Sequence, residues 1–305
     1  MKKMKIYKAV LAILVLSLCF ACKKYDDYAL DFDYTTVYFS YQKPVRTIIA
    51  DGDMTFQFGT VLTGVRENKE TREVIYKVDS NLLDTVPGAS AFTLLPQDYY
   101  TLSDTGKMVI NAGDIFGKIT VTLDQEKFTS DPLSTANTYA LPVKILSASN
   151  IDSILTDTTD IAESKYYSII VVKYMSQYGG TYLNSGAVEK LDGGNVDTTT
   201  YYTVESWDTD VKTTSTIDVN TIQTSGVSDG FSGSLQLEVT DTDAVNVDYV
   251  GTALTNFNGS GQYDNSEKAF YLNYSFTSSG TDYNVYDTLV LRQNPEYDLN
   301  KVELW

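Results

Sequence analysis

The chain has 305 residues, of which 40 are acidic, 23 are basic and none is histidine, so its net charge at pH 7 is −17. Nucleic acid is excluded as an expected partner, because phosphate contacts need a basic surface. The lack of histidine disfavours the usual serine and cysteine triads and the common zinc sites. We therefore expect a protein that is not an enzyme and that needs no cofactor.

Residues 1–21 predict a lipoprotein signal peptide. Four lysines precede an apolar run from Ala9 to Leu18, which is shorter than the roughly 20 residues that a membrane-spanning helix needs. Cys22 follows the small residue Ala21, as bacterial lipoprotein processing requires. We expect Cys22 to carry the lipid that holds the protein on the membrane; the alternative is ordinary secretion with a spare thiol.

Residues 22–34 predict an acidic tether. The four aspartates at positions 26, 27, 31 and 33 resemble the signals that send Bacteroidota surface lipoproteins to the outer face. We therefore expect a lipid anchor in the outer membrane, with the protein facing the cell exterior; a plain solvated spacer is the alternative. Removal of the signal peptide, which holds four lysines and no acids, leaves 19 basic and 40 acidic residues. It also leaves Cys22 as the one cysteine, so the fold has to rest on its apolar core rather than on disulfides.

Residues 35–175 predict an N-terminal β-sandwich. Val37, Phe39 and Tyr41 alternate with polar neighbours, and the same period of two recurs at 54–58, 74–78, 119–123, 141–145 and 169–173. Polar turns such as Asp51-Gly52 separate these runs. Many short strands joined by polar turns are typical of an all-β, immunoglobulin-like or adhesin-like sandwich.

Residues 176–305 predict a second antiparallel β domain. Phe270, Leu272, Tyr274 and Phe276 form one stripe of a strand, and residues 278–280, Ser-Ser-Gly, are a natural hairpin turn into the next strand. The segment YGGTY at 178–182 and the long terminal hairpin resemble those of calycin-type barrels. The pattern leaves a second sandwich and a calycin-like barrel both open.

Three phrases of the first domain resemble a Bacteroidota domain of unknown function: LPQDYYTLSDTGKMVINAGDIFGKITVTLD at 95–124, YALPVKILSAS at 139–149 and YYSIIVVKY at 166–174. The resemblance spans roughly residues 35–174. That domain occurs in some family 18 endo-β-N-acetylglucosaminidases and in surface lipoproteins encoded beside starch-utilisation-type glycan transporters. The resemblance implies a glycan-utilisation setting, with an outer-membrane glycan transporter complex and glycosidases as partners, and it carries over no catalytic residues.

Glycan is the ligand that the aromatic residues favour. The chain has 24 tyrosines against 12 phenylalanines, and sugar rings pack their apolar faces on such exposed rings. Tyr201, Tyr202 and Trp207 lie within one short strand and turn, and Tyr271 faces away from the Phe270 stripe. We predict that these four residues include a binding platform; for each ring taken alone, core packing is the alternative.

Two other functions stay open at this point. A structural adhesin or fimbrillin-like subunit would polymerise by strand exchange after proteolytic trimming, for example near Arg46. A glycosidase would need paired carboxylates, and ESWDTD at 205–210 is the nearest acidic cluster. The 130 residues of the second domain are too few for a (β/α)₈ barrel, which takes about 250. TDTDAVNVD at 240–248 lacks the spacing of an EF-hand, so no metal ligands are predicted.

Overall fold

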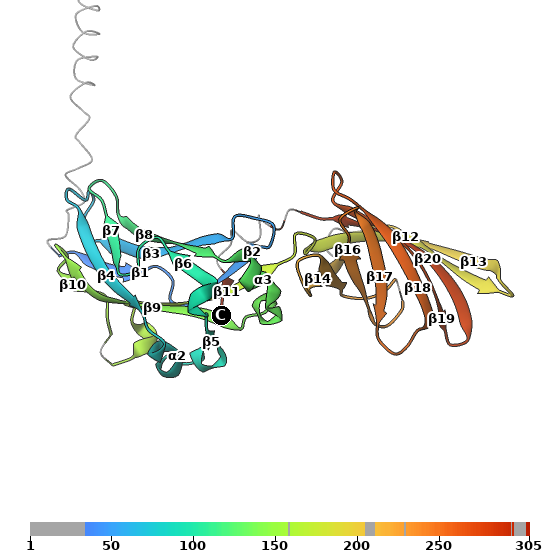
Figure 1. Ribbon diagram of the computed structural model, residues 1–305, viewed down its shortest axis with the longest axis horizontal. Helices are drawn as coiled ribbons and strands as arrows, with labels where there is room; N and C mark the ends of the chain where they lie inside the picture. Colours follow the sequence, from blue (N-terminus) through green and yellow to red (C-terminus); the bar gives the residue numbers. More distant parts are fainter. Residues whose placement is uncertain (1–33, 158, 205–210, 229, 294, 296–302) are drawn as a thin grey trace, which may run out of the picture.

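The computed structural model describes residues 34–157, 159–204, 211–228, 230–293, 295 and 303–305. The fold is all-β with a few short helices, and its strands form two bodies that lie side by side along the longest axis (Figure 1). The first body is a sandwich of a curled sheet and a mixed sheet, and the second is a closed antiparallel barrel of eight strands. The expected all-β class is confirmed, and of the two forms left open for the second domain the barrel is correct. None of the helices in these ranges is both long and apolar enough to cross a membrane.

Both sheets of the sandwich combine antiparallel strand pairs with parallel ones. The curled sheet has the order β10 (Ser153–Ile154), β1 (Thr36–Phe39), β3 (Thr55–Thr63), β8 (Phe116–Leu123), β6 (Tyr100–Leu102). The mixed sheet has the order β21 (Glu303–Leu304), β2 (Pro44–Ile49), β11 (Tyr167–Met175), β9 (Tyr139–Ser149), β4 (Arg72–Val78), β7 (Lys107–Ile110), with β5 (Thr93–Leu94) paired to β9. Parallel pairs join β1 to β10, β2 to β11 and β5 to β9.

Strand β11 is buried on both faces, which explains its nearly continuous apolar sequence. Ile170 and Val172 face the core between the two sheets. Ile169 and Val171 face the other side, where the short helix α2 (Asn81–Thr85) covers them with the side chain of Leu82. The mixed sheet is therefore the middle layer of the first body.

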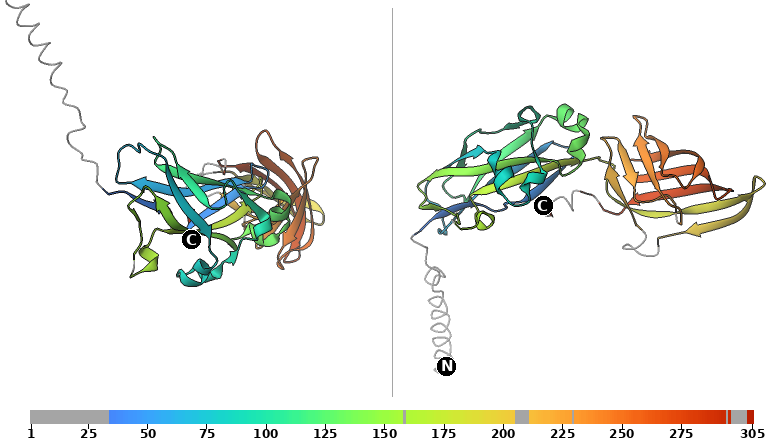
Figure 2. Two further views of the ribbon diagram at one scale, coloured as in Figure 1. Left: turned by 60° about the vertical axis from the view of Figure 1, so that its left-hand side comes forward. Right: turned by 90° about the horizontal axis from the view of Figure 1, so that it is seen from below.

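The barrel is a meander that closes on itself. Its strands in order are β12 (Thr181–Asp192), β14 (Val211–Thr216), β15 (Thr221–Thr224), β16 (Ser234–Val239), β17 (Ala244–Val250), β18 (Thr255–Asp264), β19 (Ala269–Ser278) and β20 (Thr281–Leu291). Pairing of β12 with β20, from Tyr182 opposite Leu291 to Leu191 opposite Asp282, closes the ring. Strand β13 (Asn195–Tyr202) forms a hairpin with β12 that projects at the end far from the sandwich (Figure 1 and Figure 2).

The interior of the barrel is rich in aromatic side chains. The expected stripe on β19 points inward, and Phe270 and Phe276 are 0% and 2% exposed. The turn to β20 has positive φ at both central residues, 51° at Ser279 and 79° at Gly280. This backbone shape matches the twist of a two-residue hairpin, so the expected turn is confirmed.

The last residues of the sequence return to the sandwich. Strand β21 pairs with β2, and Trp305 Nε1 donates a 2.8 Å hydrogen bond to the carbonyl oxygen of Ile169. The Trp305 indole packs edge-on against Phe92, with ring centroids 4.7 Å apart. The span 176–305 therefore includes a short strand of the first body as well as the barrel. Strand β2, which holds Arg46, is consequently paired along both edges, to β11 and to β21.

A direct contact joins the two bodies near their first connection. Ser176, just after β11, donates from Oγ to the carbonyl oxygen of Val219 at 2.7 Å, and its backbone N–H donates to Thr216 Oγ1 at 3.0 Å. Val219 itself packs against the core cluster of the sandwich. The turn between β14 and β15 is thus a part of the barrel that contacts the first body.

Candidate functional site

The predicted site residues fall into three groups. Cys22 and Trp207 lie outside the described residues, as do the acids of the 205–210 cluster. Tyr201 and Tyr271 lie on the outer surface of the second body, 77% and 40% exposed. Tyr202 points the other way, into the barrel, because neighbouring residues of a strand face opposite sides. The structure therefore brings Tyr201 and Tyr271 to one face and separates Tyr202 from them.

The outer face carries a row of residues that are directly opposite one another on neighbouring strands. Tyr201 on β13 is opposite Ala187 on β12, Ala187 is opposite Tyr286 on β20, and Tyr286 is opposite Asn273 on β19. Tyr286 is 45% exposed. Because strands lie about 4.8 Å apart, the backbones of the two tyrosines are about 10 Å apart. The small side chain of Ala187 between them leaves both rings open to solvent.

A shallow groove of about 280 Å³, which we call the amide groove, lies beside Tyr286. Its lining consists of Asn258, Ser260, Asn273, Tyr274, Ser275, Asn284, Val285 and Tyr286. Within the described part of the chain, the carboxamides of Asn258 and Asn273 make no hydrogen bond, and both residues are exposed. Asn284 Nδ2 donates to Glu189 Oε2 at 3.4 Å. The groove therefore offers neutral groups that both donate and accept.

Tyr271 lies two residues from Asn273 on the same face of β19. Its hydroxyl donates to the carboxylate of Glu267, and this hydrogen bond, together with desolvation, raises the pKa of Tyr271. The phenol is thus fixed at the edge of the face, with its ring still accessible. Sequence reasoning found Tyr201 and Tyr271 but missed Tyr286. The signal for Tyr286 was its position in β20, out of phase with the buried Val285 and Leu289.

Tyr202 takes part in a buried polar network inside the barrel. Its hydroxyl contacts the carboxyl of Asp287 and accepts a 3.0 Å hydrogen bond from Ser228 Oγ. The Tyr274 hydroxyl donates to the other carboxyl oxygen of Asp287 at 2.5 Å. Gly186 lies between Tyr202 and Asp287 in the register, and a Cβ at Gly186 would come within 2.6 Å of the Tyr202 hydroxyl. The lack of a side chain at Gly186 therefore leaves the space through which the Tyr202 phenol reaches Asp287.

Asp287 is 2% exposed, and burial raises the pKa of its carboxyl to about 8. The group is therefore mainly protonated at neutral pH, which avoids the cost of a buried charge. Its hydrogen-bond partners come from β13 and β19, and Ser228, after β15, joins the network through the Tyr202 hydroxyl. The network holds the projecting hairpin to the barrel wall, so Tyr202 is a bracing residue rather than an exposed stacking platform.

A polar cleft of about 350 Å³ opens next to this network, and Asn184, Lys212, Ser225 and Phe231 are among the residues that line it. A second hollow of about 290 Å³ lies under the projecting hairpin, lined by Lys190, Tyr202, Phe231 and Tyr283 among others. Asn184 Oδ1 is buried and has no hydrogen-bond partner among the described residues. Sequence reasoning missed Asn184, although a polar residue at an inward position of β12 is the signal to look for. Across the described ranges, no three or more His, Cys, Asp or Glu residues gather as a metal site.

Comparison with known proteins finds one matching domain model and solved structures of similar fold. A family model described as an N-terminal domain matches residues 32–152. The chain is similar to a Bacteroides ovatus protein of unknown function from structural genomics, with 22% identity and a TM-score of 0.71 over 86% of this chain and 96% of the other. A second B. ovatus protein of unknown function has 16% identity and a TM-score of 0.44 over 90% of this chain and 100% of its own. No curated protein matches the chain. Residues 32–152 are thus similar to this N-terminal domain, and the chain shares its fold with the first B. ovatus protein; neither similarity assigns a specific function.

Proposed function

We propose that the chain is a surface lipoprotein that binds host or dietary glycan without catalysis, anchored in the outer membrane through Cys22. It holds the glycan for a transporter complex and glycosidases of the same uptake system. The observation that carries the proposal is the exposed ring of Tyr286 beside the carboxamides of Asn258 and Asn273, which make no hydrogen bond with any described residue. A pyranose packs its apolar face on a ring, and its hydroxyls take hydrogen bonds from amides.

The spacing of the outer face suits a chain of sugars rather than a single one. Tyr201 and Tyr286 are separated by one strand, so their rings reach different units of an extended glycan. The amide groove continues from Tyr286 across β19 to β18. In this proposal the sandwich is a spacer between the anchor and the barrel, and the barrel is the binding head.

The test is a glycan-array and affinity-gel screen with soluble protein that begins at Lys23. We expect Tyr286→Ala to weaken glycan binding about tenfold, since one stacked ring contributes roughly 0.5–1.5 kcal/mol beyond its buried area. Tyr201→Ala should have a smaller effect, because this ring lies farther from the groove. Tyr34→Ala is the matched control: it removes a tyrosine that is 58% exposed on the first body, and binding should stay at the level of the unmodified protein.

Three outcomes would count against the proposal or relocate it. Binding that survives Tyr286→Ala and Tyr201→Ala but is lost in Trp207→Ala contradicts the amide groove and moves the platform to the 205–210 segment. Equal losses in Tyr286→Ala and Tyr34→Ala mean nonspecific adhesion to tyrosine. No binding to any glycan contradicts the proposal as a whole. Polymer formation after trimming near Arg46 would then identify the fimbrillin-like alternative.

A further inference from the structure

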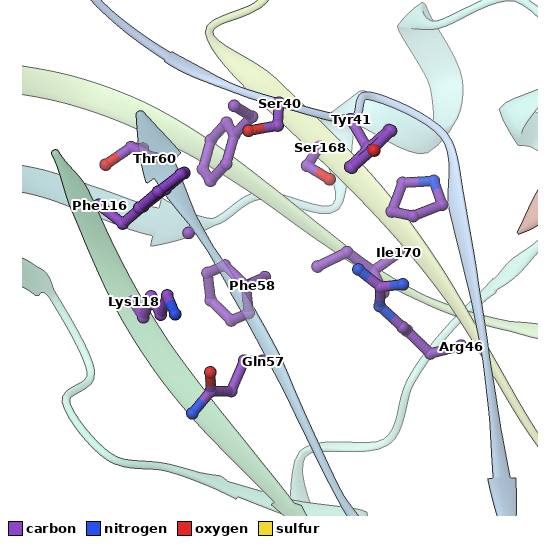
Figure 3. A pocket seen from close by; sticks show the side chains of 13 residues that line it. Ser40, Tyr41, Arg46, Gln57, Phe58, Thr60, Phe116, Lys118, Ser168 and Ile170 are labelled. Atoms are coloured by element: carbon purple, nitrogen blue, oxygen red, sulfur yellow. The ribbon is translucent and has the colours of Figure 1, made fainter. Parts of the chain in front are cut away.

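A pocket of about 160 Å³ in the sandwich lies where β1 turns into β2, far from the barrel's amide groove. Figure 3 shows its lining, with Arg46 and Lys118 on opposite sides of the Phe58 ring. Arg46 is opposite Val172 of β11, a residue of the core between the sheets, so its side chain starts from the inward face of β2. Lys118 is exposed at the rim, on β8.

The charges of this pocket are unusual for the chain. Two of its 13 lining residues are cations and none is Asp or Glu, in a protein of net charge −17. Arg46 makes no hydrogen bond or ion pair with any residue of the described ranges. Several other cations of the same body have carboxylate partners, for example Lys107 with Glu73 at 2.8 Å. The pocket therefore presents a positive charge that no described residue neutralises.

Burial adds a cost that an anion would remove. Desolvation lowers the pKa of Arg46, although a guanidinium remains charged at any physiological pH. A bound carboxylate or sulfate would pair with this cation, and the planar fork of an arginine fits two oxygens of either group. Pairing with an anion therefore stabilises Arg46 more than it would stabilise an exposed arginine, because the charge of Arg46 is partly shielded from water.

The rim of the pocket adds groups that suit a sugar ring. Tyr41 and Phe116 are 45% and 49% exposed, and Gln57 of β3 also lines the pocket. Lys118 Nζ stands 5.7 Å from the centroid of the Phe116 ring. A ring stacked on Phe116 or Tyr41 would therefore bring a charged substituent within reach of the cations.

We propose that this pocket binds the carboxylate or sulfate group of an acidic sugar, with Arg46 as the main anion ligand and Lys118 as a weaker one at the rim. The charge recognition follows from the pocket alone, and only the choice of a saccharide rests on the proposed glycan function. The site is in the first body, so its occupation does not require the amide groove.

Binding of small probes separates the two anions. Glucuronate supplies the carboxylate, galactose 6-sulfate supplies the sulfate, and unmodified galactose is the neutral probe, each titrated by calorimetry at low ionic strength into protein beginning at Lys23. We expect at least one acidic probe to bind and galactose not to bind at this site. Arg46→Gln should weaken that acidic probe by about tenfold or more, since a charge-assisted pair is lost. Lys118→Gln should cost only a few-fold, because an exposed charge is screened by solvent.

Three variants make the result specific. Arg66→Gln removes one positive charge from an exposed position of the same body and should leave acidic-probe binding unchanged. Arg46→Lys keeps the charge but loses the planar fork, and it should bind several-fold more weakly than arginine. Tyr286→Ala should keep full binding of the acidic probe, so a failure of the barrel site and a failure of this one are distinguishable.

Two results would contradict an anion site in this pocket. If neither acidic probe binds, or if Arg46→Gln and Arg66→Gln weaken binding equally, the pocket is not an anion site. In that case Arg46 is an inward-pointing charge near a sheet edge, a device that hinders edge-to-edge pairing. The melting temperature of Arg46→Gln should equal or exceed that of the unmodified protein, because an unpaired, partly buried cation is removed. Loss of binding together with unfolding is resolved by Arg46→Lys, whose retained charge must preserve part of the affinity.

Discussion

The sandwich and the barrel are both built from β-strands, but they are assembled from different kinds of strand pair. In the sandwich, β1 pairs with β10 and β2 pairs with β11 and β21, so segments more than a hundred residues apart lie together. In the barrel, nearly every pair joins strands that follow each other in the chain, and only β12 with β20 spans the whole body. Long-range pairs carry a larger closure cost and fold more slowly, so the sandwich is the body whose assembly depends on distant parts of the chain.

The interiors of the two bodies differ as well. The sandwich core between the sheets is formed by aliphatic and aromatic side chains such as Phe39, Ile119 and Ile170. The barrel interior contains, next to its aromatic residues, the buried carboxyl of Asp287 and the tyrosines that contact it. The raised pKa of Asp287 ties the stability of the barrel to pH in the neutral range, whereas the buried Asp79 of the sandwich, whose pKa is lowered by its hydrogen bond with Lys144, affects that body only in acid.

The largest expected effect is on the barrel core. Phe270 is fully buried and its ring lies against Tyr178, Tyr182 and Tyr263. Phe270→Ala should lower the free energy of unfolding of the barrel by about 3–5 kcal/mol. The chain has two tryptophans, and Trp305 packs on the sandwich. In a Trp207→Phe background, Trp305 fluorescence during urea unfolding therefore follows the sandwich alone, while far-UV circular dichroism follows both bodies.

Two results of that experiment have opposite meanings. A circular dichroism transition that moves to lower urea, with an unchanged Trp305 transition, means that the bodies unfold separately. Equal shifts of both signals mean that the contact at Val219 and the two chain connections make them one cooperative unit. The second result would contradict the treatment of the sandwich and the barrel as two separate units of stability.

The next effect is a dependence on pH that belongs to the barrel. The folded pKa of Asp287, about 8, lies above the reference value of 3.8, so the folded state keeps its proton over this range while the unfolded state has lost it. The associated stability is fully present below the unfolded pKa and is lost as pH rises toward 8, by at most about 1.4 kcal/mol per pH unit. Urea unfolding at pH 5, 6, 7 and 8 measures the slope. Asp287→Asn should flatten it, and an undiminished slope in that variant would rule out this carboxyl as its source.

A smaller effect is expected at the returning end of the chain. Trp305→Ala removes an indole packed on Phe92 and a hydrogen bond to the Ile169 carbonyl, which should destabilise the sandwich by about 2 kcal/mol. Hydrogen–deuterium exchange should rise in β2 and β11 and stay constant in the barrel strands. Leu304→Ala, at a side chain that is 60% exposed, is the control and should change neither. Faster exchange in the barrel would mean that the indole supports both bodies.

The smallest effect concerns the brace between the hairpin and the barrel. Tyr202→Phe removes one hydroxyl that contacts Asp287 and Ser228, at an expected cost of about 1 kcal/mol to the barrel. Tyr201→Phe, one residue away and facing solvent, should cost nothing measurable. Thermal unfolding of the two variants in parallel measures the difference, and equal melting temperatures would mean that water replaces the hydroxyl without loss.

Local patterns predicted the elements well, because burial on one face or two faces is written into the order of apolar residues. The stripe from Phe270 to Phe276 and the two-sided β11 are examples. The pairing of β21 with β2 was not predictable, since a strand of two residues has no period to detect. For the candidate site, alternation separates Tyr201 from Tyr202, which had been grouped by their closeness in sequence. The anion pocket depends on Arg46 and Lys118 lining one hollow from different sheets, and no local pattern contains that information.

The return of the last residues to β2 has a mechanical consequence. The chain crosses between the two bodies once after β11 and a second time between β20 and β21. A single covalent crossing acts as a swivel, about which a tethered domain turns freely, whereas two crossings at different points restrict the motion to bending about one axis. A load applied to the barrel is therefore shared between two strands of the mixed sheet, β11 and β21, and reaches the sandwich as a shear along that sheet rather than as a twist.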